Sequence, residues 1–242
     1  MVVILECAYY SQCLFQPLRR SDGSLYGVEL VTRFVTEDGV VQMPESLVSA
    51  RLSPRQHSQL LEEKVALLRG FQSAFLKHRL VIWMPVEQNS VRCILSDESL
   101  AEYLTNVPGL HLGITEQFLA SGDHYLENLF SLLERRFLLA LLNYGAGHIS
   151  GQLIFQQQFN AIMLDKQFVQ SRLKKATFQP VMYAILNQVG SACHALVING
   201  IDDKESFARA CSLPFTAMQG ALWPPVMPEH LMLLLYGNPL YP

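Results

Sequence analysis

A regular alternation of apolar, strand-like segments with amphipathic, helix-like segments constrains this chain more than any other feature. After a hairpin formed by 13–19 and 25–34, the expected strands occupy 80–86, 109–115, 137–143, 159–165, 193–200 and 215–220. The expected helices lie at 53–78, 89–105, 116–136, 166–189, 202–212 and 228–237. Strand–helix repeats at this spacing join parallel strands. The pattern therefore predicts an α/β fold, a closed (β/α) barrel that forms a single domain over 1–242.

Local signals mark the ends of several of these elements. Asp22 and Gly23, within "RSDGS", form a turn signal that joins the two strands of the hairpin. Ser53 is a good N-cap for the helix over 53–78, and Pro54 occupies its first helical position. Pro180 lies inside the helical pattern of 166–189, which predicts a kink before it.

Charge and cysteine usage exclude several classes of function. Only 16% of the residues are charged, the net charge is −3, and no block of Lys and Arg occurs, so direct binding of nucleic acid is disfavoured. No apolar run is long enough to cross a bilayer, and the first residues lack the basic start of a signal peptide. The five cysteines form no CxxC pair, which suits reduced thiols and predicts a cytoplasmic protein.

In a closed (β/α) barrel, ligands bind at the carboxyl ends of the strands, so the residues there define the candidate chemistry. The segment "FLLALLNYGAGHIS", 137–150, ends in a turn where Gly145 and Gly147 are expected to hold unusual backbone angles. Leu142 and Asn143 precede that turn, where a site would usually place charge. The other strand ends carry Glu29, Arg33, Met84, Pro85, Gly113, Thr115, Glu116, Met163, Asp165, Asn199, Asp202 and Gln219.

Other interpretations of these residues are weaker. The run "GAGHISG", 145–151, followed by Asp165, mimics a dinucleotide fingerprint, but its glycine spacing is GxGxxxG. Cys193 and His194 suggest a thiol nucleophile, but neighbours on a strand point to opposite faces. Glu29 and Arg33 are four residues apart on one strand and share a face, either as a structural ion pair or as retained ligand contacts.

A series of short motifs in conserved order resembles the EAL domain, the cyclic-di-GMP phosphodiesterase family. The motifs are "FQPL", "YGVELVTRF", "LGITE", "LLNYGAG", "IMLDKQFV", "VINGIDD" and "MQGALWPP", and they span nearly the whole chain. Each motif alone is weak evidence, but their shared order and spacing are strong. The resemblance implies the EAL-type modified TIM (β/α)8 barrel, in which the first strand of the hairpin runs antiparallel to the rest.

The resemblance also implies that the phosphodiesterase site is vestigial. The family holds a pair of divalent cations with carboxylates and one Asn. By resemblance, Glu29 is retained, but the ligand positions carry Pro85, Gly113, Leu142, Asn143 and Asn199, and Met163 replaces the lysine that assists the water. Only Asp165, Gln219 and the more distant Asp202 remain, too little charge for a pair of buried dications. We therefore expect no enzymatic activity, no metal and no cofactor.

A second function implied by the resemblance is a cyclic-di-GMP receptor that binds without cleaving. Gln16, Arg33 and Gln219 match nucleotide contacts of the family. Without metal, a doubly charged ligand would depend on Arg33 almost alone. Cyclic-di-GMP is therefore the weaker expectation for a ligand.

The chain is also similar to a group of short, stand-alone, degenerate EAL-like proteins, the YdiV-like anti-FlhDC factors. The shared segments include "GVEL", "TEDG", "MLDK" and the "LWP" of the last motif. Those proteins bind FlhD of the flagellar master regulator FlhDC and block its access to DNA. The resemblance implies the same for this chain: a regulator that represses flagellar genes and motility through protein–protein interaction. It does not identify the docking surface, the stoichiometry or a role for a protease.

Overall fold

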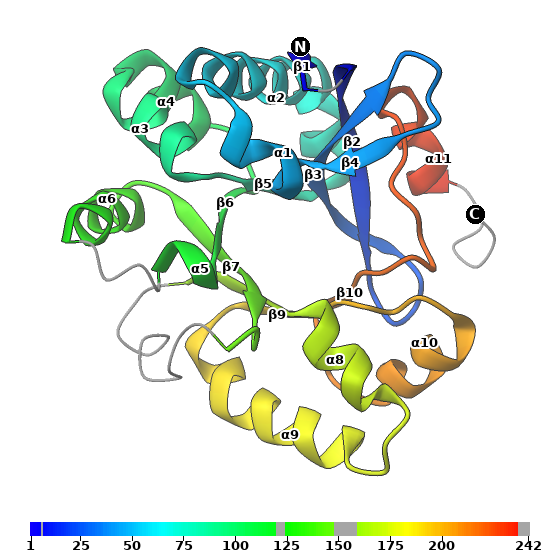
Figure 1. The fold of residues 1–242 in the computed structure, drawn as a ribbon. Helices are drawn as coiled ribbons and strands as arrows, with labels where there is room; N and C mark the ends of the chain where they lie inside the picture. The colour runs from blue at the N-terminus through cyan, green and yellow to red at the C-terminus, as the bar shows by residue number, and fades with distance from the viewer. Residues whose placement is uncertain (6, 120–123, 148–158, 237–242) are drawn as a thin grey trace.

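The computed structural model describes residues 1–5, 7–119, 124–147 and 159–236 (Figure 1). The strands are β1 Val2–Ile4, β2 Ala8–Arg19, β3 Leu25–Thr36, β4 Gln42–Pro44, β5 Val81–Pro85, β6 Leu110–Thr115, β7 Leu138–Tyr144, β8 Ala161–Leu164, β9 Ala195–Ile198 and β10 Ala217–Met218. The helices are α1 Glu45–Val48, α2 Pro54–His78, α3 Gln88–Ser96, α4 Glu98–Thr105, α5 Glu116–Leu119, α6 His124–Glu134, α8 Lys166–Leu173, α9 Phe178–Val189, α10 Lys204–Cys211 and α11 Leu231–Tyr236. Among the described helices, none is both long and apolar enough to cross a membrane.

The strands close into a barrel, as the sequence predicts. Around the ring the order is β2, β10, β9, β8, β7, β6, β5 and β3, and β3 pairs again with β2. The pairs from β3 through β5 to β10 are parallel, whereas β2 runs antiparallel to both of its neighbours, β3 and β10. The expected antiparallel strand of the hairpin is thus confirmed. Closure brings the carboxyl ends of the parallel strands together at one end of the barrel.

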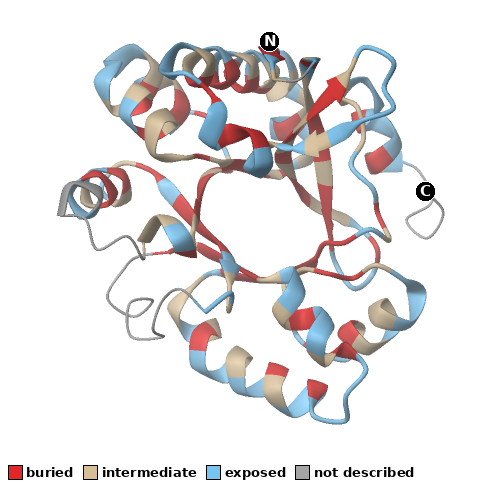
Figure 2. Ribbon diagram, viewed as in Figure 1, coloured by how far each residue is buried: buried red, intermediate tan, exposed pale blue. Residues whose placement is uncertain are grey.

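Side chains alternate along the strands between the inside of the barrel and the surrounding helices. The inner cluster is built around Trp83, which is fully buried, with smaller apolar neighbours on the other strands. These neighbours are Leu18, Ala140, Leu142, Ala161, Met163, Ala195, Val197 and Ala217. A larger cluster fills the layer between the barrel and its helices, and Figure 2 shows the buried stripe that most helices turn toward the barrel. The alanines make room for one large indole, so the barrel is a packed core rather than a pore.

Helix α2 begins and ends as its sequence indicates. The Ser53 hydroxyl accepts a hydrogen bond from the Gln56 N–H, and the Gln56 side chain accepts one from the Ser53 N–H. This capping box satisfies donors that the first helical turn leaves unpaired. At the other end, Arg79 adopts a left-handed conformation with φ of 51° and closes the helix.

Two of the expected helices are divided within the described residues, and a third, 116–136, contains α5 and α6 on either side of residues outside the described part. The segment 166–189 forms α8 and α9, separated at 174–177, so the helix is interrupted before Pro180, as expected, but by a break rather than a kink. Pro180 lies in the first turn of α9, where its missing N–H removes no helical hydrogen bond. The segment 89–105 divides into α3 and α4 at Asp97, whose carboxylate caps α4 by accepting from the Leu100 N–H. A capping side chain inside a helical pattern therefore marks this break.

The hairpin extends beyond the barrel into a small antiparallel sheet that the sequence did not indicate. Strand β1 pairs with the start of β2, and β4 pairs with the end of β3. One face of this sheet packs on α1 and α2 through a separate apolar cluster that includes Val3, Tyr9, Phe34, Val48, Leu52 and Leu60. The extension stands above the carboxyl ends of the strands and so forms one wall of the barrel mouth (Figure 1).

Candidate functional site

The mouth of the barrel collects most of the residues that the sequence singled out. Glu29 on β3 is in register with Trp83 on β5, Pro85 with Gly113 on β6, and Thr115 with Leu142 on β7. Met163 on β8 joins Leu142 in the inner cluster, and Gln219 follows β10. The structure therefore brings the expected positions from separate strands to one end of the barrel.

Glu29 is the acidic side chain that remains inside the mouth. Its carboxylate accepts a hydrogen bond of 2.7 Å from Nε2 of the buried Gln219. Protein atoms crowd the carboxylate, and this desolvation raises the pKa of Glu29 above the usual range, although the Gln219 bond and the Lys64 charge oppose the shift. The Glu29 carboxylate thus accepts from a neutral donor, the Gln219 amide, and this hydrogen bond occupies one carboxylate oxygen.

Lys64 supplies a cation beside the mouth that the sequence analysis missed. It reaches from α2 with only 3% of its surface exposed, pairs with Glu45 at 2.9 Å and donates to the Pro85 carbonyl at 3.4 Å. The sequence did contain a signal for this cation, a lysine within the apolar stripe of Leu60, Leu61, Val65 and Leu68. A charged side chain in such a stripe needs a partner when it is buried. An ammonium group thus lies next to the backbone of Pro85.

Apolar side chains fill the space at the centre of the mouth. Leu142 is 4% exposed and Met163 is 2% exposed. A Cβ atom on Gly113 would lie 2.7 Å from Cδ1 of Leu142 and 3.2 Å from the Cα of Pro85. The Leu142 side chain therefore occupies the volume into which any side chain at position 113 would project. The two positions fit each other as a packed pair, with no room between them for an ion.

The turn after β7 has the backbone geometry that its glycines predict. Gly145 and Gly147 have φ of 98° and 93°, and Asn143 has φ of 59°, a region that Asn tolerates better than most residues. The buried Glu116 carboxylate accepts a 2.7 Å hydrogen bond from the Gly145 N–H and so anchors the turn. Residues 148–151 of the proposed dinucleotide fingerprint lie outside the described residues.

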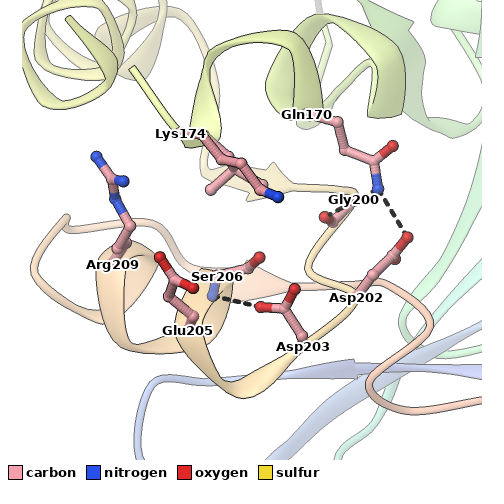
Figure 3. Close-up of a pocket in the computed structure, with 9 residues that line it drawn as sticks. Gln170, Lys174, Gly200, Asp202, Asp203, Glu205, Ser206 and Arg209 are labelled. Atoms are coloured by element: carbon pink, nitrogen blue, oxygen red, sulfur yellow. Dashed lines mark hydrogen bonds between the residues drawn. The ribbon is translucent and has the colours of Figure 1, made fainter. Parts of the chain in front are cut away.

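The other polar candidates serve local structure. Asp165 caps α8 by accepting from the Phe168 N–H at 2.7 Å, and the Asn199 side chain accepts from the Gly200 N–H at 2.7 Å. Asp202 joins Lys166 at 2.8 Å and accepts from Gln170 and the Ala221 N–H, each at 2.7 Å. Figure 3 shows the Asp202 carboxylate turned toward Gln170 of α8. Asp202 thus ties α8 to two loops, and its carboxylate is engaged by these local partners.

The candidate nucleotide contacts are also engaged, and the suggested Glu29–Arg33 ion pair is not formed. Arg33 donates to the side-chain oxygens of Gln12 at 3.1 Å and Gln42 at 3.0 Å, both in the sheet above the mouth. Gln16 donates to the Trp223 carbonyl at 2.7 Å. Glu29 and Arg33 share a face of β3, as expected, but four positions along a strand separate their Cα atoms by about 13 Å. That distance is too long for an ion pair.

Cys193 and His194 do not form a nucleophile–base pair. The Cys193 thiol donates to the Val189 carbonyl at 3.7 Å, and burial raises the pKa of Cys193 to about 11. A thiol with so high a pKa is a poor nucleophile near neutral pH. All five cysteines are free, and the described residues contain no group of three His, Cys, Asp or Glu side chains that would hold a metal ion.

The mouth as a whole does not fit a pair of divalent cations. Glu29 faces Gln219, Leu142 and Met163 fill the centre, and Lys64 places a positive charge nearby. Such cations need several oxygen ligands around a shared cavity. Among the residues that the structure describes, the arrangement at the mouth can accept or donate single hydrogen bonds, and its centre is filled by apolar side chains.

The fold and the mouth together define a known class of protein. Its members are closed barrels with one antiparallel strand, and here the second strand of the hairpin, β3, carries Glu29 in the mouth. The chain belongs to the EAL domain family, whose sequence model matches residues 11–225. Within that family it is similar to a protein of Salmonella arizonae named anti-FlhC(2)FlhD(4) factor YdiV, with 39% identity over 236 residues, 97% of this chain and 99% of that one.

Two further comparisons agree. The putative anti-FlhC(2)FlhD(4) factor YdiV of Escherichia coli is 34% identical over 226 residues, 93% of this chain and 95% of that one. The crystal structure of the EAL-like domain protein YdiV superposes with a TM-score of 0.83 and 34% identity, covering 94% of this chain and 97% of that one. The expected barrel and the expected family are therefore both confirmed.

Proposed function

We propose that this protein is a regulator that binds FlhD in the FlhDC flagellar master regulator, blocks its access to DNA and so represses flagellar genes and motility. The observation that carries the proposal is the packed mouth, in which Leu142 fills the space beside Gly113. A family member whose site is filled must act through its surface. Similarity over nearly the full length to proteins named for FlhC(2)FlhD(4) supports the partner.

The proposal includes the absence of phosphodiesterase activity. At the vestigial positions Pro85, Gly113, Leu142, Asn143 and Met163, no side chain offers a carboxylate or an ammonium group. Purified protein with Mg²⁺ or Mn²⁺ should therefore leave cyclic-di-GMP intact. Turnover that scales with protein concentration and disappears in Glu29→Ala would disprove this part of the proposal.

The regulatory function is tested with the purified FlhC(2)FlhD(4) complex and DNA carrying its binding site. Adding the protein should release the DNA in a gel-shift assay, and the protein alone should leave free DNA unshifted, in line with its lack of a basic block. Expression of the protein in motile cells should reduce swimming. An unchanged complex with DNA at a large molar excess of the protein would contradict the proposal. Such a function requires a cytoplasmic protein and treats 1–242 as one domain.

A cyclic-di-GMP receptor is the second candidate, and one observation favours it. The guanidinium of Arg33 bonds to two neutral amides, Gln12 and Gln42, so its charge is not neutralised by these contacts and stays available to a phosphate. Gln16 and Gln219 are committed to Trp223 and Glu29, which opposes binding. Calorimetry in metal-free buffer separates the candidates, because a receptor requires a stoichiometric titration that Arg33→Ala abolishes.

A further inference from the structure

Strand β1 forms one open edge of the small antiparallel sheet that stands above the mouth. Among the described strands it pairs only with β2, with Val2 in register with Tyr10 and Ile4 in register with Ala8. Strand β4 forms the opposite edge of the same sheet, beyond β3 (Figure 1). An open edge presents backbone N–H and C=O groups with which another strand can pair.

The hydrogen-bond pattern shows which backbone groups of β1 face the open side. One position beyond the Val2–Tyr10 pair, the Ser11 N–H donates to the Met1 carbonyl at 2.9 Å. In an antiparallel pair, such hydrogen-bonded positions alternate with positions whose N–H and C=O point away from the neighbouring strand. The backbone groups of Val2 and Ile4 therefore point outward, and they have no partner among the residues that the structure describes.

The two edges of the sheet differ in their protection against pairing. Edge strands commonly carry a proline or charged side chains, which discourage another chain from adding to them. Strand β4 ends in Pro44, which has no N–H, and the turn before it carries the charged Asp38. Residues 1–5, MVVIL, contain neither a proline nor a charged side chain. Val2 and Ile4 nevertheless expose 46% and 79% of their surface, so the β1 edge is apolar and unprotected.

We propose that the β1 edge pairs with the β1 edge of a second copy of this chain, so that the two small sheets join into one antiparallel sheet. The occupant of this edge must be an extended segment, because only an extended backbone reaches outward groups that are spaced two residues apart. The inference goes beyond the proposed function and does not depend on the flagellar regulator.

The outward groups of β1 match those of a second copy in one particular register. When the Val3 residues of two copies face each other across a twofold axis, Val2 of each copy faces Ile4 of the other. Both of these residues direct N–H and C=O groups outward, so both facing positions become hydrogen-bonded pairs. The contact then contains about four hydrogen bonds, two from each pair.

The side chains on the exposed face of the sheet suit the same register. Val2 is in register with Tyr10, and Tyr10 with Val35 of β3, so these three side chains form an apolar row. In the joined sheet, Ile4 of the second copy extends this row across the contact. A symmetric contact brings like residues near each other, so a charged edge would repel itself, but residues 1–5 carry no charged side chain. The β1 edge is therefore complementary to a copy of itself.

The contact is small, so the association should be weak and depend on concentration. Strand β1 has 3 residues, far fewer than a standard protein–protein interface uses. Sedimentation velocity of the purified, untagged protein between about 1 µM and about 1 mM should show a monomer at the low end and a reversible dimer toward the high end.

Two lysine substitutions at equally exposed positions of the same sheet test the location of the contact. Ile4→Lys places a charge on the β1 edge, against Val2 of the second copy, whereas Val40→Lys places one in the turn beside β4; the native side chains expose 79% and 78% of their surface. We expect Ile4→Lys to raise the dissociation constant of the dimer at least tenfold and Val40→Lys to leave it unchanged. Thermal midpoints verify that both variants fold.

Disulfide trapping tests the register in a background in which the exposed Cys7 is replaced by serine. The Cα atoms of a hydrogen-bonded pair lie about 5.5 Å apart, within the range that a disulfide spans. Val2→Cys protein mixed with Ile4→Cys protein should therefore form a cross-linked dimer under oxidising conditions. Either variant alone should not, because like positions lie about 9 Å apart in this register.

The outcomes decide whether a second copy occupies the edge. A native protein that stays monomeric over the whole concentration range overturns the inference, as does a dimer that Ile4→Lys leaves intact. Equal cross-linking of the mixture and of each variant alone contradicts the proposed register. If the native protein is monomeric and Ile4→Lys, but not Val40→Lys, weakens binding of the FlhC(2)FlhD(4) complex, the edge receives a strand of that partner instead; the inference then fails while the proposed function stands.

Discussion

Leu142 and Gly113 show how single side chains decide whether this barrel mouth holds ions or hydrocarbon. Position 113 has no side chain, and Leu142 occupies the volume that one would need. The replacement is therefore mutual: either residue by itself would leave a clash or a cavity. An acidic side chain introduced at either position would meet a neighbour that is adapted to an apolar partner.

The fit between these residues predicts a strong energetic coupling. Gly113→Ala should lower the free energy of unfolding by about 1–3 kcal/mol, since the new Cβ forces Leu142 from its packed position. Leu142→Ala should cost about 2–5 kcal/mol by leaving a cavity. The double variant should lose less than the sum, as measured by urea denaturation in a double-mutant cycle. Strict additivity would show that the two positions do not compete for space.

Glu29 predicts a dependence of stability on pH. Its pKa is raised in the folded protein, mainly by desolvation, so the native state binds this proton more tightly than the unfolded state. The contribution of Glu29 to stability is therefore lost as pH rises from the ordinary Glu pKa through the raised pKa of Glu29.

The variant Glu29→Gln keeps an acceptor for Gln219 and removes the titration. Relative to the native protein, its free energy of unfolding should increase as pH rises from the ordinary Glu pKa, about 4.3, upward. Urea denaturation of both proteins across this range measures the difference, in which other titrating groups cancel. A difference that stays constant or changes in the opposite direction would contradict the assignment.

At the scale of elements, α2 joins three parts of the molecule. Its capping box at Ser53 fixes where it begins, Lys64 reaches toward the mouth, and its outer face lines an open groove beside α3 and α4.

The cap of α2 provides a test with a matched control. Ser53→Ala should lower the free energy of unfolding by about 1 kcal/mol, because the Gln56 N–H loses its acceptor. Ser73→Ala makes the same change at an exposed position inside α2 and should be neutral or slightly stabilising, since alanine has the higher helix propensity. Chemical denaturation of the two variants should therefore give effects of different sign or size; equal effects would show that the cap does not contribute.

At the scale of the whole molecule, the barrel separates its mouth from its outer layer of helices. The mouth lies at the carboxyl ends of the strands, while the groove between α2 and the α3–α4 pair faces outward. A protein that acts through its surface can lose its mouth chemistry while keeping the barrel as a rigid support.

This separation predicts which variants affect the partner. Glu29→Gln and Gln219→Ala change the mouth and should leave affinity for the FlhC(2)FlhD(4) complex nearly intact. Reversing a charge at an exposed helical position, as in Arg69→Glu, should weaken it, because a mismatched charge at an interface costs several kcal/mol. Affinities are compared with and without cyclic-di-GMP, after thermal midpoints have verified folding. A large loss from the mouth variants, or a response to the nucleotide, would instead indicate a nucleotide-gated switch.

The sequence by itself determined the features that depend on neighbouring residues. Periodicity placed the strands and most helices, Ser53 and Pro54 marked the start of α2, and the glycines after β7 predicted positive φ angles. The order of the motifs also gave the family and the barrel. These features are local because capping, turn geometry and strand alternation act over a few residues.

Only the tertiary structure decided which distant side chains meet. The pairing of Lys64 with Glu45, the space that Leu142 takes from Gly113, and the turn of Asp202 toward α8 each join different elements. Arg33 likewise bonds to Gln12 and Gln42 rather than to Glu29. Sequence spacing showed that Glu29 and Arg33 share a face of β3, but not which groups on β2 and β4 would reach Arg33 first. Those contacts follow from strand register and barrel closure, which no short segment of the chain specifies alone.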